Sequence, residues 1–168
     1  MLARICGQGA LPGLIVRNSF HAPVIAALEQ FEPEGLDVDI TFRLETLGTL
    51  LNLLKARGVV QVCFAGAIRR LKVDPERIDA ATHPLVAKIA AALAGGDDAA
   101  LRSVIDIFEE AGFEVVGFTQ LVPALLPPVG VLSIRQPGAQ DRADVARAQQ
   151  VVEGLSPLDM GQKGCLVA

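Results

Sequence analysis

Apolar residues follow two spacings along this chain, and the spacing separates predicted strands from predicted helices. Short continuous apolar runs are typical of buried strands, whereas leucine or alanine at every third or fourth position indicates a helix. The runs predict strands from Leu2 up to Gly7 and over 23–28, 39–42, 59–65 and 113–118. The helical spacing predicts helices over 13–20, 47–57, 84–93, 99–111 and 121–126.

This alternation predicts an α/β fold in which helices sandwich a mainly parallel sheet with right-handed crossovers. The segment 59–65 is apolar apart from Gln61 and is rich in β-branched residues, so we expect it to lie inside the sheet, covered on both faces. Thr46 is expected to cap the helix over 47–57, and Gly58 to end it. A further edge strand is expected over 129–134, after the Pro127-Pro128 stop.

The pattern changes beyond Pro137. Asp141 is expected to cap a helix that continues to about Leu155, and an apolar strand is expected over 163–168. A strand with nothing after it has little to pair with, so we interpret the chain as shortened. The sequence thus predicts one domain over 1–137 and, over 138–168, an interdomain helix and the first strand of an incomplete second domain.

Composition narrows the class of protein. The 168 residues are 51% apolar but include no Trp, no Tyr and only seven Phe, which suits aliphatic helices packed on a parallel sheet. No apolar run reaches the length of a membrane span, and no signal peptide is evident. The three cysteines are odd in number and far apart, which argues against a disulfide framework and predicts a reducing, cytoplasmic setting. The net charge of −4 weighs against a nucleic-acid partner. Cys6 and Cys63 lie in predicted strands and are expected to be buried thiols, and together with Cys165 they show no zinc spacing.

The candidate chemistry begins at the loop after the first strand. Gly7 and Gly9 form a Gly-x-Gly turn before a predicted helix, and such a helix start favours anions. The turn therefore predicts a phosphate or nucleotide site, with a plain βα turn as the alternative. Leu11-Pro12 stands where a dinucleotide fingerprint has its third glycine, which weighs against a dinucleotide-dependent oxidoreductase, as does the poor acidic candidate Glu29-Gln30 after the second strand.

Two charged pairs are further candidates. Arg69-Arg70 follows the strand over 59–65, where guanidinium groups could hold a phosphate or simply face solvent. Asp97 is expected to cap the helix over 99–111, which leaves Asp98 free to face a ligand or Mg²⁺, although we favour capping for this pair. Neither His21 nor His83 has a partner at ligand spacing. These residues favour binding of a phosphorylated ligand and supply no catalytic set.

Several runs, in order along the whole chain, resemble UDP-2,3-diacylglucosamine pyrophosphatases of lipid A biosynthesis, of the two-domain alphaproteobacterial type. They are Gly7-Gln8-Gly9-Ala10-Leu11-Pro12, Leu47-Gly48, Leu53-Leu54-Lys55, Phe64-Ala65-Gly66-Ala67-Ile68-Arg69-Arg70, Gly96-Asp97-Asp98-Ala99-Ala100-Leu101-Arg102, Glu110-Ala111-Gly112-Phe113-Glu114-Val115-Val116-Gly117, Asp141-Arg142-Ala143-Asp144 and Leu158-Asp159-Met160-Gly161-Gln162. The chain departs from the family at Leu71-Lys72, where relatives usually have proline after the arginine pair.

The resemblance implies a Rossmann-like N-terminal domain of an enzyme that hydrolyses UDP-2,3-diacylglucosamine to UMP and 2,3-diacylglucosamine 1-phosphate (lipid X). It implies Mg²⁺ as cofactor and a substrate held between two domains, with peripheral contact to the inner membrane. Separately from the resemblance, an apolar domain face exposed by truncation would favour association into a homodimer. By resemblance, substrate-binding roles fall on Gly7, Gly9, Gly66, Arg69, Arg70, Asp97, Asp98 and Gln162.

Family members also carry an acidic catalytic segment in the second domain that is missing from these residues. The resemblance therefore assigns no catalytic residue and no metal ligand, and we expect this chain to be inactive by itself. The alternative is a stand-alone nucleotide-binding or regulatory module without catalysis. An in-frame continuation of the gene past Ala168 would favour the enzyme over that module.

Overall fold

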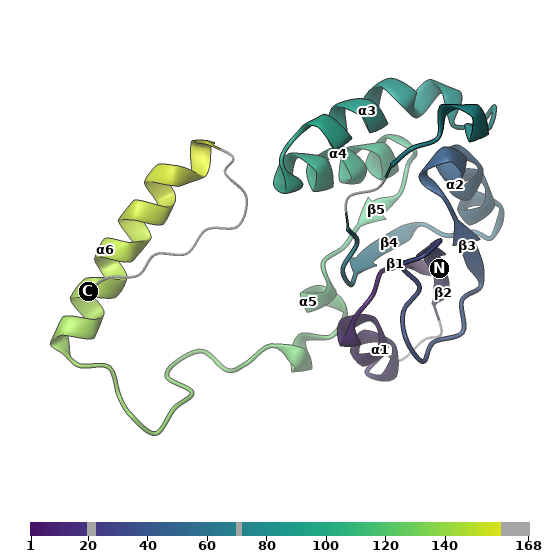
Figure 1. Cartoon of the computed structure of the whole chain (residues 1–168). Helices are drawn as coiled ribbons and strands as arrows, with labels where there is room; N and C mark the ends of the chain where they lie inside the picture. The colour runs from purple at the N-terminus through teal and green to yellow at the C-terminus, as the bar shows by residue number, and fades with distance from the viewer. Residues whose placement is uncertain (20–22, 70–71, 159–168) are drawn as a thin grey trace.

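A five-stranded, all-parallel sheet forms the centre of the computed structural model, which describes residues 1–19, 23–69 and 72–158 (Figure 1). The strand order is β3-β2-β1-β4-β5, so the order reverses between β1 and β4. The strands are β1 (Leu2–Cys6), β2 (Val24–Leu28), β3 (Ile40–Phe42), β4 (Gln61–Ala65) and β5 (Glu114–Val115). Helices cover both faces, which confirms the predicted Rossmann-like α/β fold.

The larger core lies on the face of the sheet covered by α2 (Leu47–Ala56), α3 (Val86–Ala94) and α4 (Asp97–Glu110). The α2 leucines repeat at helical spacing, and four of them are buried against Ala3 and Ile5 of β1 and their neighbours. Gly58 has a φ of 71° and its N–H donates to Lys55 O at 2.9 Å, so it ends α2 as predicted.

The opposite face is covered by α1 (Ala10–Arg17) and α5 (Phe118–Leu121), and its core is small. Arg4 lies in the middle of this face, fully buried, with Cys63 beside it on β4. Its Nη2 donates to Ser19 Oγ, while Nε and Nη1 have no hydrogen-bond partner among the described residues. Burial raises the pKa of the neighbouring Cys6 thiol to about 11, against the opposing charge of Arg4. Cys6 and Cys63 are buried, as expected.

Three local predictions were wrong. Residues 129–134 form no strand, because no strand among the described residues pairs with them, and Val129 and Ile134 are fully exposed. Gly96, rather than Asp97, stands before the first turn of α4, so Asp97 is a helical residue and not its cap. Asp141 lies inside α6 (Ala139–Leu155), where its carboxylate accepts a hydrogen bond from Gly138 N at 2.7 Å.

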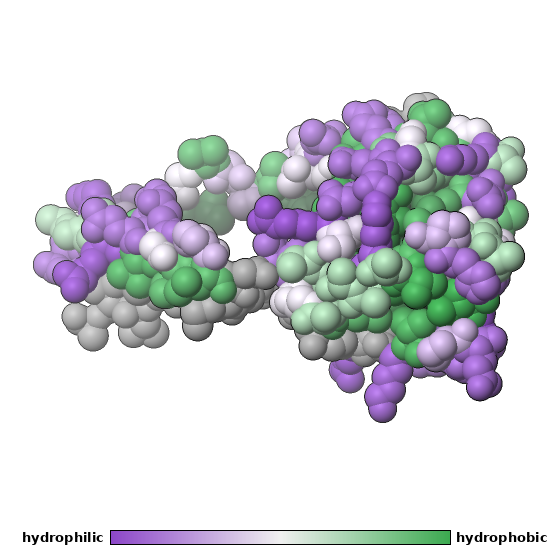
Figure 2. Space-filling model, turned by 90° about the horizontal axis from the view of Figure 1, so that it is seen from above, coloured by the Kyte–Doolittle hydropathy of each residue, from purple (hydrophilic) through white to green (hydrophobic). Residues whose placement is uncertain are grey.

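The C-terminal helix α6 lies apart from the sheet, beyond an extended segment (Figure 1). None of its residues is buried, and polar and apolar side chains are mixed on its surface (Figure 2). The boundary at residue 137 stays a prediction. The strand expected over 163–168 lies outside the described residues.

Candidate functional site at the carboxyl edge of the sheet

The loops after β1 and β4 meet at the point where the strand order reverses. Gly7 N donates to Ala65 O at 2.8 Å, and Gln8 and Ala67 exchange two backbone hydrogen bonds of 2.9 Å. In open parallel sheets, ligands bind outside the carboxyl ends of the strands near this reversal point. Here the backbone itself closes the crevice between β1 and β4, so a ligand has to lie beside this bridge.

This bridge explains two of the predicted site glycines. A Cβ on Gly7 would lie 2.5 Å from Ala67 O, and a Cβ on Gly66, whose φ is +99°, would lie 2.5 Å from Gly7 O. Only glycine permits such close approach of two loops. The fold therefore brings Gly7 and Gly66 together. The close contact between the two loops explains by itself why both positions are glycine.

Gly9 differs from these two glycines because it faces open space. Its φ is also +99°, yet a Cβ built on it would have nothing within 4 Å. Gly9 occupies the N-cap position of α1, where no side chain caps the helix and no acidic residue lies in the first turn. The first N–H groups of α1 and the positive end of the helix dipole are thus available to an anion above Gly9.

The other predicted site residues within the described part of the chain lie on two separate segments, the loop after β4 and the start of α4. Arg69 is exposed in the segment after β4. The Asp98 carboxylate is paired with Arg102 Nε at 2.8 Å on the same exposed helix face, and Asp97 lies beside it in the first turn of α4. Arg70 and Gln162 lie outside the described residues. The substrate-binding roles of all these residues stay predictions.

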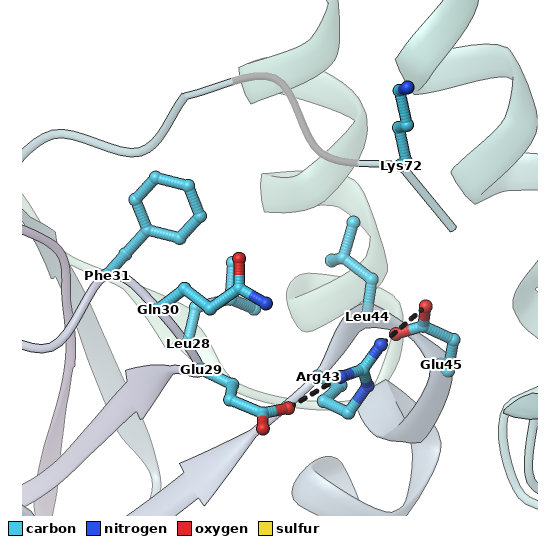
Figure 3. Close-up of a pocket in the computed structure, with 8 residues that line it drawn as sticks. All are labelled: Leu28, Glu29, Gln30, Phe31, Arg43, Leu44, Glu45 and Lys72. Atoms are coloured by element: carbon cyan, nitrogen blue, oxygen red, sulfur yellow. Dashed lines mark hydrogen bonds and ion pairs between the residues drawn. The ribbon is translucent and has the colours of Figure 1, made fainter. Parts of the chain in front are cut away.

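A cavity of about 390 Å³ opens beside the bridged loops, at the carboxyl ends of β2 and β3 (Figure 3). Its apolar walls come from Leu28, Phe31 and Leu44. Its polar side chains are Glu29, Gln30, Arg43, Glu45 and, from the loop after β4, Lys72.

Arg43 connects two carboxylates across the floor of this cavity. Its Nη1 lies 2.7 Å from Glu29 Oε2 and its Nη2 lies 3.3 Å from Glu45 Oε1 (Figure 3). Its Nε is buried and has no hydrogen-bond partner among the described residues. Burial alone would favour the neutral form of Glu45, but the hydrogen bonds from Asp74 N and Arg43 outweigh it and lower the Glu45 pKa.

Gln30 has an unusual backbone conformation at the cavity wall. Its φ is +74°, and among the described residues it is the one non-glycine residue with positive φ. Gln8 Nε2 donates to Gln30 O at 3.2 Å, so the glycine loop is directly joined to the cavity wall. Positive φ in a residue with a Cβ is strained, and such residues concentrate at functional sites.

Sequence reasoning did not find this cavity. By its pattern, Glu29-Gln30 is a poor acidic candidate at the end of the second strand, and Lys72 is part of a departure from the family runs. Arg43 and Glu45 belong to no motif, since they approach Glu29 only when β2 and β3 pair. The one local signal was a carboxylate directly after a predicted strand.

The strand order and the flanking helices define a Rossmann-like domain with a cavity at the carboxyl edge of its sheet. Residues 1–125 match the family described as the LpxI N-terminal domain, and the chain belongs to this family. It is 31% identical to the UDP-2,3-diacylglucosamine pyrophosphatase LpxI of Caulobacter vibrioides, over 96% of this chain and 59% of that protein. The chain thus spans less than two thirds of that relative, and the predicted family resemblance is confirmed.

The described residues were also searched for groups of metal ligands and for membrane-spanning helices. Within the described residues, no group of three or more His, Cys, Asp or Glu side chains could hold a metal ion. Within the same residues, no helix has the length and hydropathy needed to cross a bilayer.

Proposed function

We propose that this chain is the N-terminal, substrate-binding part of a UDP-2,3-diacylglucosamine pyrophosphatase, which releases UMP and lipid X. The match over residues 1–125 carries the proposal. The geometry supports it, because Gly9 and the start of α1 offer an open anion site next to a cavity large enough for a small organic group.

The described residues contribute binding rather than bond cleavage in this proposal. The α1 N-terminus would receive the diphosphate oxygens, since backbone N–H groups and the helix dipole stabilise negative charge there. Arg69 and Arg70 would add positive charge after β4. A divalent ion such as Mg²⁺ would neutralise diphosphate charge and is proposed as a requirement of the complete enzyme, with ligands other than a cluster in the described residues.

Contact with the cytoplasmic surface of the inner membrane is part of the proposal, because the substrate is a lipid. Exposed apolar side chains are concentrated in the segment before α6, which provides apolar surface beside the sheet domain. They are Leu126, Val129, Val131, Leu132 and Ile134. Sedimentation with vesicles that contain anionic lipid tests the membrane contact, and light scattering after gel filtration tests the proposed homodimer.

Calorimetric titration with UDP-2,3-diacylglucosamine and Mg²⁺, with NADH as the comparison ligand, tests the proposed function. We expect saturable binding of the lipid nucleotide, no binding of NADH and no release of UMP by this chain. Binding of NADH alone would replace the proposal with a dinucleotide-binding protein. Rapid Mg²⁺-dependent release of UMP would show that these residues include a complete catalytic set.

A further inference from the structure

We propose that Arg4 is a positioning residue for the diphosphate of the substrate, because its buried charge lies at the C-terminal end of α1 and strengthens anion binding at the other end, above Gly9. This inference rests on the proposed function and goes beyond it, since it assigns a role in binding to a side chain that no ligand can touch. Arg4 is 0% exposed, on the face of the sheet that α1 and α5 cover.

The charge of Arg4 is not neutralised by its surroundings. Within the part of the chain that the structure describes, no ion pair includes Arg4, and its Nε and Nη1 have no hydrogen-bond partner. The groups nearest in charge are the thiols of Cys63, opposite on β4, and Cys6, two residues along β1. Burial raises the pKa of both thiols, so both are neutral at neutral pH. Burial lowers the pKa of Arg4, yet a guanidinium stays protonated in proteins.

A chain of hydrogen bonds joins this charge to the last turn of α1. Arg4 Nη2 donates to Ser19 Oγ, and Ser19 Oγ donates to Ile15 O at 2.7 Å. Ser19 follows Asn18, the C-cap of α1, so the guanidinium lies where the helix carbonyls concentrate negative charge. Arg4 therefore offsets the negative end of the α1 dipole, while the positive end at Gly9 faces open space.

The two ends of α1 are close enough for this charge to act on a ligand. From Gly9 to Ser19 the chain rises roughly 15 Å, at about 1.5 Å per residue. Helix and sheet rather than water fill most of this distance, so the effective dielectric constant lies between that of a protein interior and that of water. A unit charge then lowers the Kd of a doubly charged anion by roughly fivefold to tenfold.

A structural role alone does not account for arginine at position 4. Burial of an ion is unfavourable unless a partner compensates for it, and an apolar side chain of the same size would pack more stably. The hydrogen bond to Ser19 recovers only a small part of that cost. An anion bound above Gly9 would compensate for a further part, which explains why this position carries a charge.

Titrations of the whole chain with inorganic diphosphate and with UDP-2,3-diacylglucosamine test the inference. Arg4→Met removes the charge and largely keeps the volume, so it should fold at least as well as the wild type, while its Kd for diphosphate rises about fivefold or more. Arg4→Lys keeps the charge and should bind nearly as tightly as the wild type. Arg57→Met removes an exposed charge at the end of α2 and is the matched control, with an unchanged Kd.

A second pair of variants leaves Arg4 in place. Cys63→Asp places a carboxylate opposite Arg4 on β4, so it should neutralise the charge and raise the Kd for diphosphate as Arg4→Met does. Cys63→Ser is uncharged and is its control. Both charge-removing variants should weaken diphosphate more than orthophosphate, because the electrostatic effect grows with the charge of the ligand, whereas a structural defect would weaken both equally.

The outcomes separate the role of Arg4 from the proposed function. Unchanged Kd values for diphosphate in Arg4→Met and Cys63→Asp would overturn the role of Arg4, and binding of UDP-2,3-diacylglucosamine by the same variants would leave the proposed function intact. Equal losses in Arg4→Met and Arg4→Lys would also overturn it, because geometry rather than charge would then matter. If Arg4→Met did not fold, Cys63→Asp and Cys63→Ser would decide. If the wild type bound neither diphosphate nor the lipid nucleotide, the proposed function would be wrong and the role of Arg4 with it.

Discussion

The carboxyl edge of the sheet has two halves that use glycine and charge in opposite ways. Between β1 and β4, Gly7 and Gly66 let two loops approach so closely that their backbones fill the crevice. Beyond β2 and β3, no glycine lines the wall, and charged and amide side chains surround an open cavity. The crevice between β1 and β4, where the glycine motif lies, is thus closed by backbone. The cavity lies beyond β2 and β3, where the sequence shows no motif.

This difference shows that glycine in a βα loop is an ambiguous sign of a ligand. Gly66 and Gly9 share a φ of +99°, yet Gly66 contacts the neighbouring loop and Gly9 faces open space. The same sequence letter therefore serves loop packing in one place and ligand access in the other. Substitutions on both halves can separate the two roles.

The largest effect is expected at the bridged half. Gly66→Ala adds a Cβ 2.5 Å from Gly7 O at a backbone angle that already disfavours alanine, so the free energy of unfolding should fall by roughly 2–5 kcal/mol. Gly9→Ala is the control with the same φ and open space, and its backbone strain alone should cost about 1–3 kcal/mol, less than Gly66→Ala, where the contact with Gly7 O is added. Urea denaturation measures both. Equal losses would mean that the contact between the loops adds nothing to stability.

A smaller loss is expected at the open half when its buried carboxylate is altered. Glu45→Gln removes the charge that accepts hydrogen bonds from Asp74 N and Arg43, and should lower the free energy of unfolding by about 1–3 kcal/mol. Glu109→Gln, at an exposed helix position, should change it by less than about 0.5 kcal/mol. If Glu45→Gln left the free energy of unfolding unchanged, the ion pair with Glu29 would be enough to hold Arg43.

At Gln30 we expect a substitution to increase the free energy of unfolding rather than to lower it. Gln30→Gly relieves the positive φ and should raise the free energy of unfolding by about 1 kcal/mol, measured by urea denaturation. Gln140→Gly is the control at an exposed helix position, where glycine should instead destabilise by about 1 kcal/mol. If Gln30→Gly destabilised the protein as much as this control does, the glutamine would stabilise the turn and the strain argument would fail.

The smallest expected effect is on the pH dependence of stability. The Glu45 pKa is lower in the folded protein than in the unfolded chain, so the unfolded chain takes up the proton first as the pH falls. The contribution of Glu45 is therefore complete at neutral pH and is lost below the ordinary glutamate pKa of about 4.3. The free energy of unfolding, measured by urea denaturation from about pH 7 to pH 3.5, should decline less steeply with falling pH for Glu45→Gln than for the wild type. Identical slopes would exclude a contribution from Glu45.

Much of the fold could be predicted because its signals are local. The four buried leucines of α2 and the glycine at its end are readable from spacing alone, and the buried runs mark β1, β2 and β4 within one or two residues. The prediction of an edge strand over 129–134 was wrong for a physical reason. Apolar residues predict burial, but a strand forms only where a partner edge is available.

The candidate site was less predictable than the fold. The α/β alternation, the Gly7-x-Gly9 loop and the family runs can be predicted from the chain alone, because each depends on neighbouring residues. The fold is needed to show that Gly7 and Gly66 contact each other, that Arg4 is buried beside Cys63, and that Glu29, Arg43 and Glu45 form one network. These contacts join residues on different strands and loops, so they depend on strand order, which spacing along the chain does not encode.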